Sequence, residues 1–427
     1  MPVLEGSAVR KGVEDNNRST CGGAGRKGLR TLLVSLAIGS AVALGGCAGR
    51  PGTDALAVNV TPEAGAKPVK VLVATTRMRD ANPGVLFNGE RSEKLDFASV
   101  TLTVPPTHKT GQIEWAKQGA GNPATDMVVR DAVYRDTEAQ FLQELNADLA
   151  KRPKGERDVF IFVHGYNTQF SEAIFRLTQM THDADATAVP VLFTWASRGK
   201  TEDYVYDNNS ATAARDNLEE LIKLVARSNA ERFSILAHSM GNWVTVEALR
   251  QMRIDKSLPD PKRIANIVLA APDIDVDVFK SQLRRFGKPE KPFVVIVSHD
   301  DKALKISDLI AGGKQRLGSY SDDRELVSLG AVVVDMTDVK SDGDGLNHGK
   351  FAQLAGLRSQ LRQTLEKTAT SGNIPASVEM DQIRITGITP TMAGSMPGGT
   401  TKPVTATTAT TTTGAAIATS GATATPQ

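Results

Sequence analysis

The chain has 427 residues, of which 40% are hydrophobic and 23% are charged, and its formal net charge at pH 7 is +2. This composition is typical of a soluble globular protein, and the length allows one large domain with extensions. A net charge so near zero gives no sign of the clustered basic excess of nucleic-acid-binding proteins, so no nucleic-acid partner is expected. The two cysteines, Cys21 and Cys47, are too few for a disulfide framework or a cysteine-rich zinc site.

Residues 26–47 have the layout of a secretory signal. Three basic residues precede an apolar run at 31–44, which is too short to span a bilayer with the usual margin. The ending Leu44-Gly45-Gly46-Cys47 resembles a bacterial lipobox. That resemblance implies a lipidated Cys47 at the start of the mature chain and a lipoprotein anchored in the cell envelope, in the outer membrane if the bacterium has two membranes. An ordinary signal peptide and an uncleaved anchor are the alternatives.

Composition divides the chain into four parts. A signal peptide with an N-terminal extension is expected at 1–46, and a Gly-, Ala- and Pro-rich tether at 47–66. The folded domain is expected at 67–368. The segment 369–427 ends in a Thr- and Ala-rich stretch with almost nothing large and apolar to bury, so it is expected to stay disordered.

Apolar, β-branched runs alternate with helical patterns inside the domain. Several runs are continuously apolar, as strands covered on both faces must be. This alternation predicts an α/β fold with a doubly wound, mostly parallel sheet and helices on both faces. The expected strands are 69–75, 100–104, 159–163, 189–195, 233–237, 264–271, 293–298 and 331–336, and the expected helices are 137–151, 169–181, 209–228, 241–253, 276–285, 302–311 and 350–367.

Residues 233–252 contain the candidate nucleophile. A short apolar strand runs into Ala237-His238-Ser239-Met240-Gly241, and a helical pattern starts at once. This is the arrangement of a nucleophile elbow, in which small residues two before and two after the serine permit a sharp turn. Ser239 would then stand at a helix N-terminus, above the edge of the sheet. The alternative is a serine that only caps a helix.

The histidine and the acid are expected after the serine in the chain. His348 lies in a Gly-rich loop between the last strand and the last helix, so it is the favoured base, and the alternative is a surface histidine in a turn. Asp301 is the favoured acid, and Asp273, at the end of the preceding strand, is the second candidate. His238 is interpreted as structural because neighbouring side chains at an elbow point apart. No cofactor and no metal are expected.

A second oxyanion loop is expected at His164-Gly165-Tyr166-Asn167, which ends an apolar strand. The backbone N–H groups of Tyr166 and Met240 are assigned as the oxyanion donors. Trp195 ends the next strand, where it could form a pocket wall or belong to the core.

Several blocks in order resemble the α/β-hydrolase superfamily, and more closely an uncharacterised bacterial esterase/lipase-like branch. They are VHGYN, FTW, AHSMGN, LAAPD and SHDDKAL, at 163–167, 193–195, 237–242, 269–273 and 298–304, with ATTR at 74–77 and the stretch 100–115 upstream. The resemblance covers about 67–365. It implies the hydrolase fold and, through the last block, the acid role of Asp301.

Two functions are therefore open. The first is a serine hydrolase, tethered to the envelope, that cleaves esters or related acyl bonds of small-molecule or acylated envelope substrates through an acyl-enzyme. The second is a non-catalytic envelope lipoprotein that uses the same fold for binding or assembly.

Overall fold

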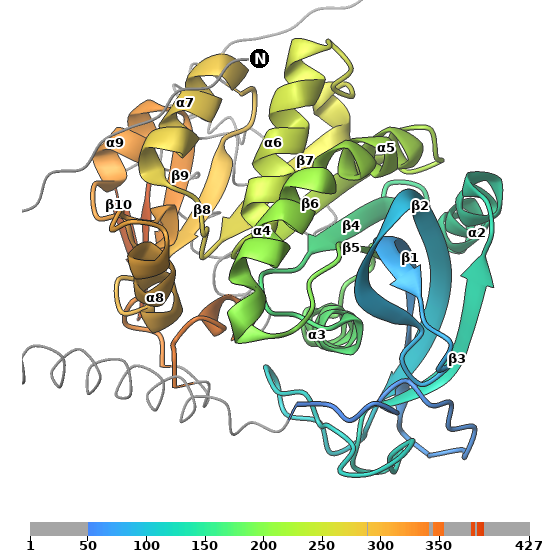
Figure 1. Cartoon of the computed structure of the whole chain (residues 1–427). Helices are drawn as coiled ribbons and strands as arrows, with labels where there is room; N and C mark the ends of the chain where they lie inside the picture. Colours follow the sequence, from blue (N-terminus) through green and yellow to red (C-terminus); the bar gives the residue numbers. More distant parts are fainter. Residues whose placement is uncertain (1–49, 288, 341–344, 354–376, 381, 388–427) are drawn as a thin grey trace, which may run out of the picture.

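A single twisted sheet of eleven strands forms the centre of the molecule (Figure 1). The computed structural model describes residues 50–287, 289–340, 345–353, 377–380 and 382–387. The strand order is β10-β11-β9-β8-β7-β6-β4-β5-β1-β2-β3. The strands are β1 (Lys67–Arg79), β2 (Phe87–Val104), β3 (Val128–Arg135), β4 (Asp158–Val163), β5 (Val189–Thr194), β6 (Arg232–His238), β7 (Ile264–Ala270), β8 (Phe293–Val297), β9 (Ala331–Asp335), β10 (Ser377–Met380) and β11 (Ile383–Thr386).

The middle of the sheet is parallel and its margins are antiparallel. Every neighbouring pair from β1 through β5, β4, β6, β7 and β8 to β9 is parallel. At one margin the pairs β1–β2 and β2–β3 are antiparallel, and at the other margin the pairs β9–β11 and β11–β10 are antiparallel. Parallel strands end at a common edge of the sheet, and that edge is where active sites of such folds lie.

Helices follow most of the parallel strands. They are α2 (Glu138–Ala150), α3 (Phe170–Asp183), α4 (Tyr204–Ala213), α5 (Arg215–Ala226), α6 (Gly241–Ile254), α7 (Val276–Phe286), α8 (Lys302–Ile310) and α9 (Asp323–Ser328), with short 3-10 turns at Thr201–Asp203, Pro261–Arg263, Leu317–Ser319 and Lys350–Gln353. None of the helices in the described part of the chain has the length and hydropathy needed to cross a bilayer.

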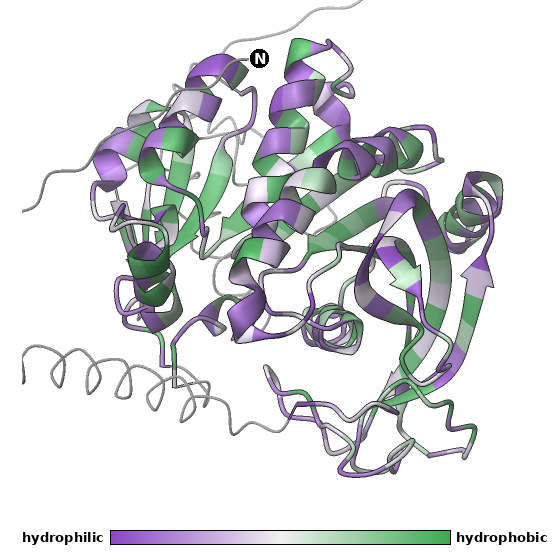
Figure 2. Cartoon of the chain, in the orientation of Figure 1, coloured by the Kyte–Doolittle hydropathy of each residue, from purple (hydrophilic) through white to green (hydrophobic). Residues whose placement is uncertain are grey.

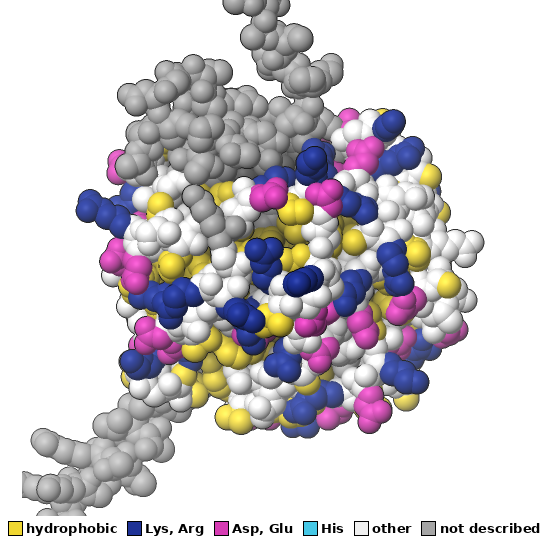
Figure 3. All heavy atoms as spheres, turned by 90° about the horizontal axis from the view of Figure 1, so that it is seen from above, with side chains coloured by type: hydrophobic (Ala, Val, Ile, Leu, Met, Phe, Trp, Pro, Cys, Tyr) yellow, Lys and Arg dark blue, Asp and Glu magenta, His cyan; other side chains and the backbone are white. Residues whose placement is uncertain are grey.

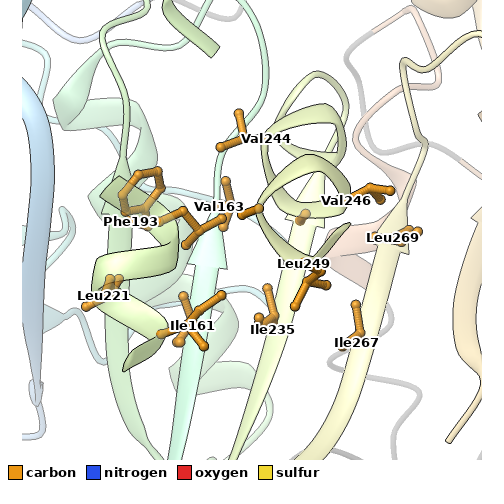
Figure 4. Close-up of a cluster of buried hydrophobic side chains, with 14 of the residues drawn as sticks. Ile161, Val163, Phe193, Leu221, Ile235, Val244, Val246, Leu249, Ile267 and Leu269 are labelled. Atoms are coloured by element: carbon orange, nitrogen blue, oxygen red, sulfur yellow. The ribbon is translucent and has the colours of Figure 1, made fainter. Parts of the chain in front are cut away.

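The sheet buries a hydrophobic core on each face. On one face, Ile161 and Ile235 pack with α5 and α6 through Leu221 and Leu249 (Figure 4). On the other face, Phe162 belongs to a cluster formed with α3, since successive residues of a strand point to opposite faces. The central strands are accordingly hydrophobic along their length, and the outer helix surfaces are hydrophilic (Figure 2).

The predicted fold class is confirmed, and all eight expected strands are present. Several features were missed or merged, and α9 is one that was missed. β3 and the first half of β2 carry exposed polar residues, so their apolar content is diluted. The helix expected at 209–228 is divided at Ala214 into α4 and α5. Of the helix expected at 350–367, the described part, Lys350–Gln353, is a 3-10 turn.

The domain extends beyond the expected bounds of 67–368 at both ends. Leu56, expected in a tether at 47–66, is 1% exposed and packs in the core beside β1 and β2. The segment 50–66 is therefore attached to the domain at Leu56, while most of its other residues are exposed. At the other end, β10 and β11 join the sheet from within the segment expected to be a disordered tail. The expected signal at 1–46 and Cys47 lie outside the described residues.

The surface carries no extended field of one sign on the face seen in Figure 3. Lys and Arg side chains are interspersed with Asp and Glu side chains over that face. This mixture fits the net charge of +2 and gives no basic stripe there of the kind that binds a nucleic-acid backbone.

Truncation separates the contribution of β11 from that of the Thr-rich segment. A chain that ends at Gly387 should keep the free energy of unfolding of the full chain, because the residues removed supply almost no core area. A chain that ends at Ala376 should lose about 3–6 kcal/mol, because Ile383 and Ile385, both at least 95% buried, leave the core. Urea unfolding monitored by circular dichroism measures both. Equal losses in the two truncated chains would contradict the assignment of β10 and β11 to the folded domain.

Candidate active site

Ser239 stands at a sharp turn between β6 and α6. Its φ is +52°, a left-handed value that residues other than glycine rarely adopt. The Ser239 N–H donates to the carbonyl oxygen of Ala270 at 3.0 Å, and the Asn242 side chain donates to the carbonyl oxygens of both Ser239 and Ala270 at 2.9 Å. These bonds from β7 and α6 hold the strained turn in place, as an elbow requires.

The turn is so tight that its neighbours must be small. A Cβ atom on Gly241 would lie 2.3 Å from the carbonyl oxygen of His164, and a Cβ atom on Gly165 would lie 2.7 Å from Cβ of Ser239. Ala237 is fully buried. The small residues that the sequence placed around the serine are thus required by the close approach of β4 and β6.

Asp301 and His348 meet at the same edge of the sheet. Oδ2 of Asp301 lies 2.6 Å from Nδ1 of His348, although the two residues are 47 positions apart. Asp301 is 0% exposed, and its other oxygen accepts from the backbone N–H of Leu304 at the start of α8. The carboxylate is therefore fixed by a helix N-terminus while it orients the imidazole and selects the tautomer with the proton on Nδ1.

Asp273, the second candidate for the acid, is engaged elsewhere. Its Oδ1 accepts from the hydroxyl of Ser307 at 2.6 Å and lies 3.2 Å from Nε of Arg316. Its Oδ2 accepts from the hydroxyl of Tyr204 at 3.3 Å. The geometry thus favours Asp301 over Asp273 as the partner of His348.

His238 packs behind His348. Its ring lies 4.6 Å from the His348 ring and is stacked on Phe351 at 4.2 Å between centroids. Burial, together with the nearby His348, lowers the pKa of His238 well below its usual value, so the ring stays neutral. A neutral ring can donate its Nε2–H to the carbonyl oxygen of His348, 3.3 Å away. His238 therefore serves as a support for the His348 loop.

Lys350 is a buried residue that the sequence analysis did not single out. It connects the loop of Asp300 and Asp301, after β8, to the loop that carries His348. Nζ of Lys350, 3% exposed, donates to both carboxylate oxygens of Asp300 at 2.8 Å and to the carbonyl oxygen of Thr337 at 2.7 Å. Burial disfavours the Asp300 carboxylate, but the bonds from Lys350 and Ser298 outweigh it and hold the pKa of Asp300 below its usual value. Asn347 also donates to Asp300, at 2.8 Å.

The expected oxyanion donors lie in the two turns that meet beneath Ser239. In the part of the chain that the structure describes, the backbone N–H groups of Tyr166 and Met240 have no hydrogen-bond acceptor. The turn after β4 is held from outside by Asp207, whose Oδ2 accepts from the N–H of Asn167 at 3.0 Å. Neither N–H group is therefore engaged within the described residues, as an oxyanion donor requires.

Arg77 supports this turn from behind. It is 1% exposed, and it donates to the carbonyl oxygens of Thr168 and Ser197, both at 2.7 Å. Burial lowers the pKa of Arg77 to about 10, so it stays charged at neutral pH. Burial and the Arg77 guanidinium lower the pKa of His164 to about 3, which keeps that imidazole neutral. The ATTR block at 74–77 contains this arginine, and the sequence pattern alone indicates no role for it.

Trp195 is buried among the core residues. Its side chain is 0% exposed, its Nε1–H donates to the carbonyl oxygen of His164 at 2.9 Å, and its ring stacks on the His164 ring. This burial favours a core role for Trp195 over the expected pocket wall. Trp195 is buried because β5 is covered on both faces, and a side chain just past the end of the strand is buried with it.

Gly241 offers a test of the elbow. Gly241→Ala should lower the free energy of unfolding by at least about 1–3 kcal/mol, because the new Cβ atom collides with the backbone at His164. Gly52→Ala is the matched control, since a Cβ atom there has no neighbour within 4 Å. Thermal unfolding measures both. Equal melting temperatures for the two variants would show that the turn is less crowded than its geometry requires.

Comparison with known proteins gives a family but no function. No curated protein is found to match the chain. Among solved structures, the chain is similar to a mutant of the esterase rPPE (13% identity, 80% of this chain and 96% of that chain, TM-score 0.32) and to a thermostable esterase from Pseudomonas putida ECU1011 (14% identity, 80% and 98%, TM-score 0.32). Residues 137–365 match the family whose description is Alpha/beta hydrolase of unknown function (DUF900), and the chain therefore belongs to that family.

Proposed function

We propose that this chain is a serine hydrolase that cleaves esters or related acyl bonds through a triad of Ser239, His348 and Asp301. The observation that carries the proposal is the 2.6 Å contact between Asp301 and His348 at the sheet edge where Ser239 forms the elbow. A buried carboxylate on Nδ1 leaves Nε2 of the imidazole as the basic atom, which is the arrangement a general base needs.

In the first half of the proposed reaction, Nε2 of His348 takes the proton from the Ser239 hydroxyl as its oxygen attacks the acyl carbon. Asp301 stabilises the imidazolium that forms. The backbone N–H groups of Tyr166 and Met240 donate to the negatively charged oxygen of the tetrahedral intermediate. His348 then returns the proton to the leaving alcohol, and the acyl group stays on Ser239.

In the second half, water replaces the alcohol. His348 takes a proton from the water, whose oxygen attacks the acyl carbon, and the same two N–H groups stabilise the second tetrahedral intermediate. Collapse breaks the bond between the acyl carbon and the Ser239 oxygen, and His348 returns the proton to that oxygen. The carboxylic acid leaves, and the enzyme regains its starting state.

We further propose that the enzyme works at the cell envelope, tethered by a lipid on Cys47. The sequence pattern before Cys47 supports this placement. In a bacterium with two membranes the outer membrane is the proposed site. Small-molecule esters and acylated envelope components are the proposed substrates.

The triad predicts a specific pattern of losses. Ser239→Ala should abolish hydrolysis of a p-nitrophenyl ester as fully as Ser239→Ala combined with His348→Ala, because residues that act as a unit give non-additive losses. Asp301→Asn should slow turnover by about 10⁴-fold, while the matched variant Asp273→Asn should keep turnover of the original order. Labelling by a fluorophosphonate, mapped by peptide mass, should fall on Ser239.

Three outcomes would count against this assignment. An inactive Asp273→Asn beside an active Asp301→Asn would transfer the acid role to Asp273. A label on another residue would remove Ser239 as the nucleophile. A folded wild-type chain that neither hydrolyses esters nor takes the label would favour a binding or assembly role for the same fold.

The lipid anchor is tested by one substitution. The wild-type chain should fractionate with membranes, and its mature N-terminal peptide should carry acyl mass on Cys47. Cys47→Ala should lose that mass and the membrane association, because no other thiol is available at the cleavage site. Cys21→Ala is the matched control and should change neither. Unchanged fractionation and mass in Cys47→Ala would refute the anchor.

A further inference from the structure

A long connection without regular secondary structure lies on α3, far from the proposed triad. It joins β2 to β3 and runs from Pro105 to Met127. Trp115 of this connection stacks on Phe175 of α3 with 4.7 Å between ring centroids. The carbonyl oxygen of Gly111 accepts from Arg176, at 3.1 Å. The connection is therefore held to the helix by a ring contact and a hydrogen bond. A third contact is a cluster of two histidines and an aspartate.

That cluster consists of His108 from the connection and His182 and Asp183 from the last turn of α3. One ligand atom from each of the three lies within 4.8 Å of the others. Nε2 of His108 is 2.6 Å from Oδ1 of Asp183, and the rings of His108 and His182 meet edge to face at 5.0 Å. Two imidazoles and one carboxylate form a donor set that suits zinc.

A second carboxylate fixes the orientation of His108. Oε2 of Glu114 lies 2.8 Å from Nδ1 of His108, and its Oε1 also accepts from the backbone N–H of Lys109. Nδ1–H bonding to a carboxylate leaves Nε2 as the ligand atom, as in many zinc sites. Asp183 is fixed in the same way, since its Oδ2 accepts from the N–H of Gly111 at 2.7 Å and from Gln179.

We propose that His108, His182 and Asp183 bind one zinc ion, with Glu114 orienting His108 through Nδ1. Zinc–ligand distances of about 2.0–2.1 Å place adjacent tetrahedral ligand atoms roughly 3.3 Å apart, so Nε2 of His108 and Oδ1 of Asp183 need to separate by less than 1 Å. Water completes the tetrahedron. The carboxylates of Asp183 and Glu114 balance the charge of the ion, and the C-terminal end of α3 favours a cation.

The ion lies away from the proposed triad and takes no part in the proposed ester cleavage. α3 begins just after the turn that carries Tyr166 and ends at Asp183, and its 14 residues span about 20 Å. The ion therefore clips the connection 105–127 onto the far end of α3, which closes a long loop between His108 and Asp183, 75 residues apart. The sequence analysis expected no metal because His108 joins His182 and Asp183 only after folding.

The same residues allow a competing arrangement, in which His108 is an imidazolium held between Glu114 and Asp183. His182 distinguishes the two. No hydrogen bond to its ring occurs within the described residues, so it adds nothing to the imidazolium arrangement, whereas zinc needs it as a ligand. His182→Gln therefore removes a metal ligand and leaves the contacts of His108 with both carboxylates intact.

The test uses the full chain, purified without a histidine tag and stripped with EDTA. Isothermal titration with ZnCl₂ should give one ion per chain, and saturating zinc should raise the melting temperature by roughly 5 °C. His182→Gln should weaken zinc binding by about 100-fold or more and abolish the rise, while melting like the wild type in EDTA. Glu114→Gln should weaken binding by about 10–100-fold. Co²⁺ should give the visible absorption of a tetrahedral site in the wild type and not in His182→Gln.

His299→Gln is the matched control, because His299 is a partly exposed histidine outside the cluster, and it should bind zinc like the wild type. Circular dichroism in EDTA shows that each variant is folded. If His182→Gln does not fold, Glu114→Gln and the Co²⁺ spectrum decide the question. No zinc bound by the stripped wild type, or full zinc affinity in a folded His182→Gln or Glu114→Gln, would overturn the proposal.

Discussion

The left-handed turn at Ser239 is the constraint on which the rest of the site depends. A serine with φ of +52° stores about 1–3 kcal/mol of strain, and the surrounding structure must hold it. Here the parallel strands β4, β6 and β7 do so: the carbonyl oxygen of Ala270 fixes the Ser239 N–H, and His164 lies directly against Gly241. The strain keeps the hydroxyl at the sheet edge and leaves the next N–H group, that of Met240, without an acceptor among the described residues.

Two buried cationic side chains hold the loops around the site. Arg77 and Lys350 are almost fully buried, and each donates to several carbonyl oxygens at the carboxyl edge of the sheet. A buried cation is costly unless its donors are satisfied, so these residues hold their loops in one arrangement. Arg77 fixes the turn after β4, and Lys350, through Asp300, joins the loop after β8 to the loop of His348. Lys350 thus connects the loops that carry Asp301 and His348, while Arg77 supports the turn that carries Tyr166.

The sequence predicted those features that local pattern determines. The strand at 159–163 is continuously apolar and the strand at 233–237 is apolar except for Ser234, because both faces of each are covered. The elbow could be recognised because Gly241 must be small. Chain order led to the pairing of Asp301 with His348, which the geometry supports. The remaining features depend on long-range packing. An arginine is usually exposed, so nothing marked Arg77 as buried. β11 pairs with β9, and β10 pairs with β11, but both strands are only four residues long and stand in a segment whose composition predicted disorder. The burial of Trp195 and the cluster around His108 likewise follow only from the folded arrangement.

A crystal structure of the chain inactivated with a phosphonate ester would be the most direct test of Ser239 as the nucleophile. Phosphorus should be bonded to Oγ of Ser239, with its phosphoryl oxygen 2.7–3.1 Å, by analogy with oxyanion sites, from the backbone nitrogens of both Tyr166 and Met240. His348 should remain hydrogen-bonded to Asp301, with Nε2 directed at the adduct. A phosphonate on any other residue, or a phosphoryl oxygen directed away from both N–H groups, would contradict the proposed catalytic site.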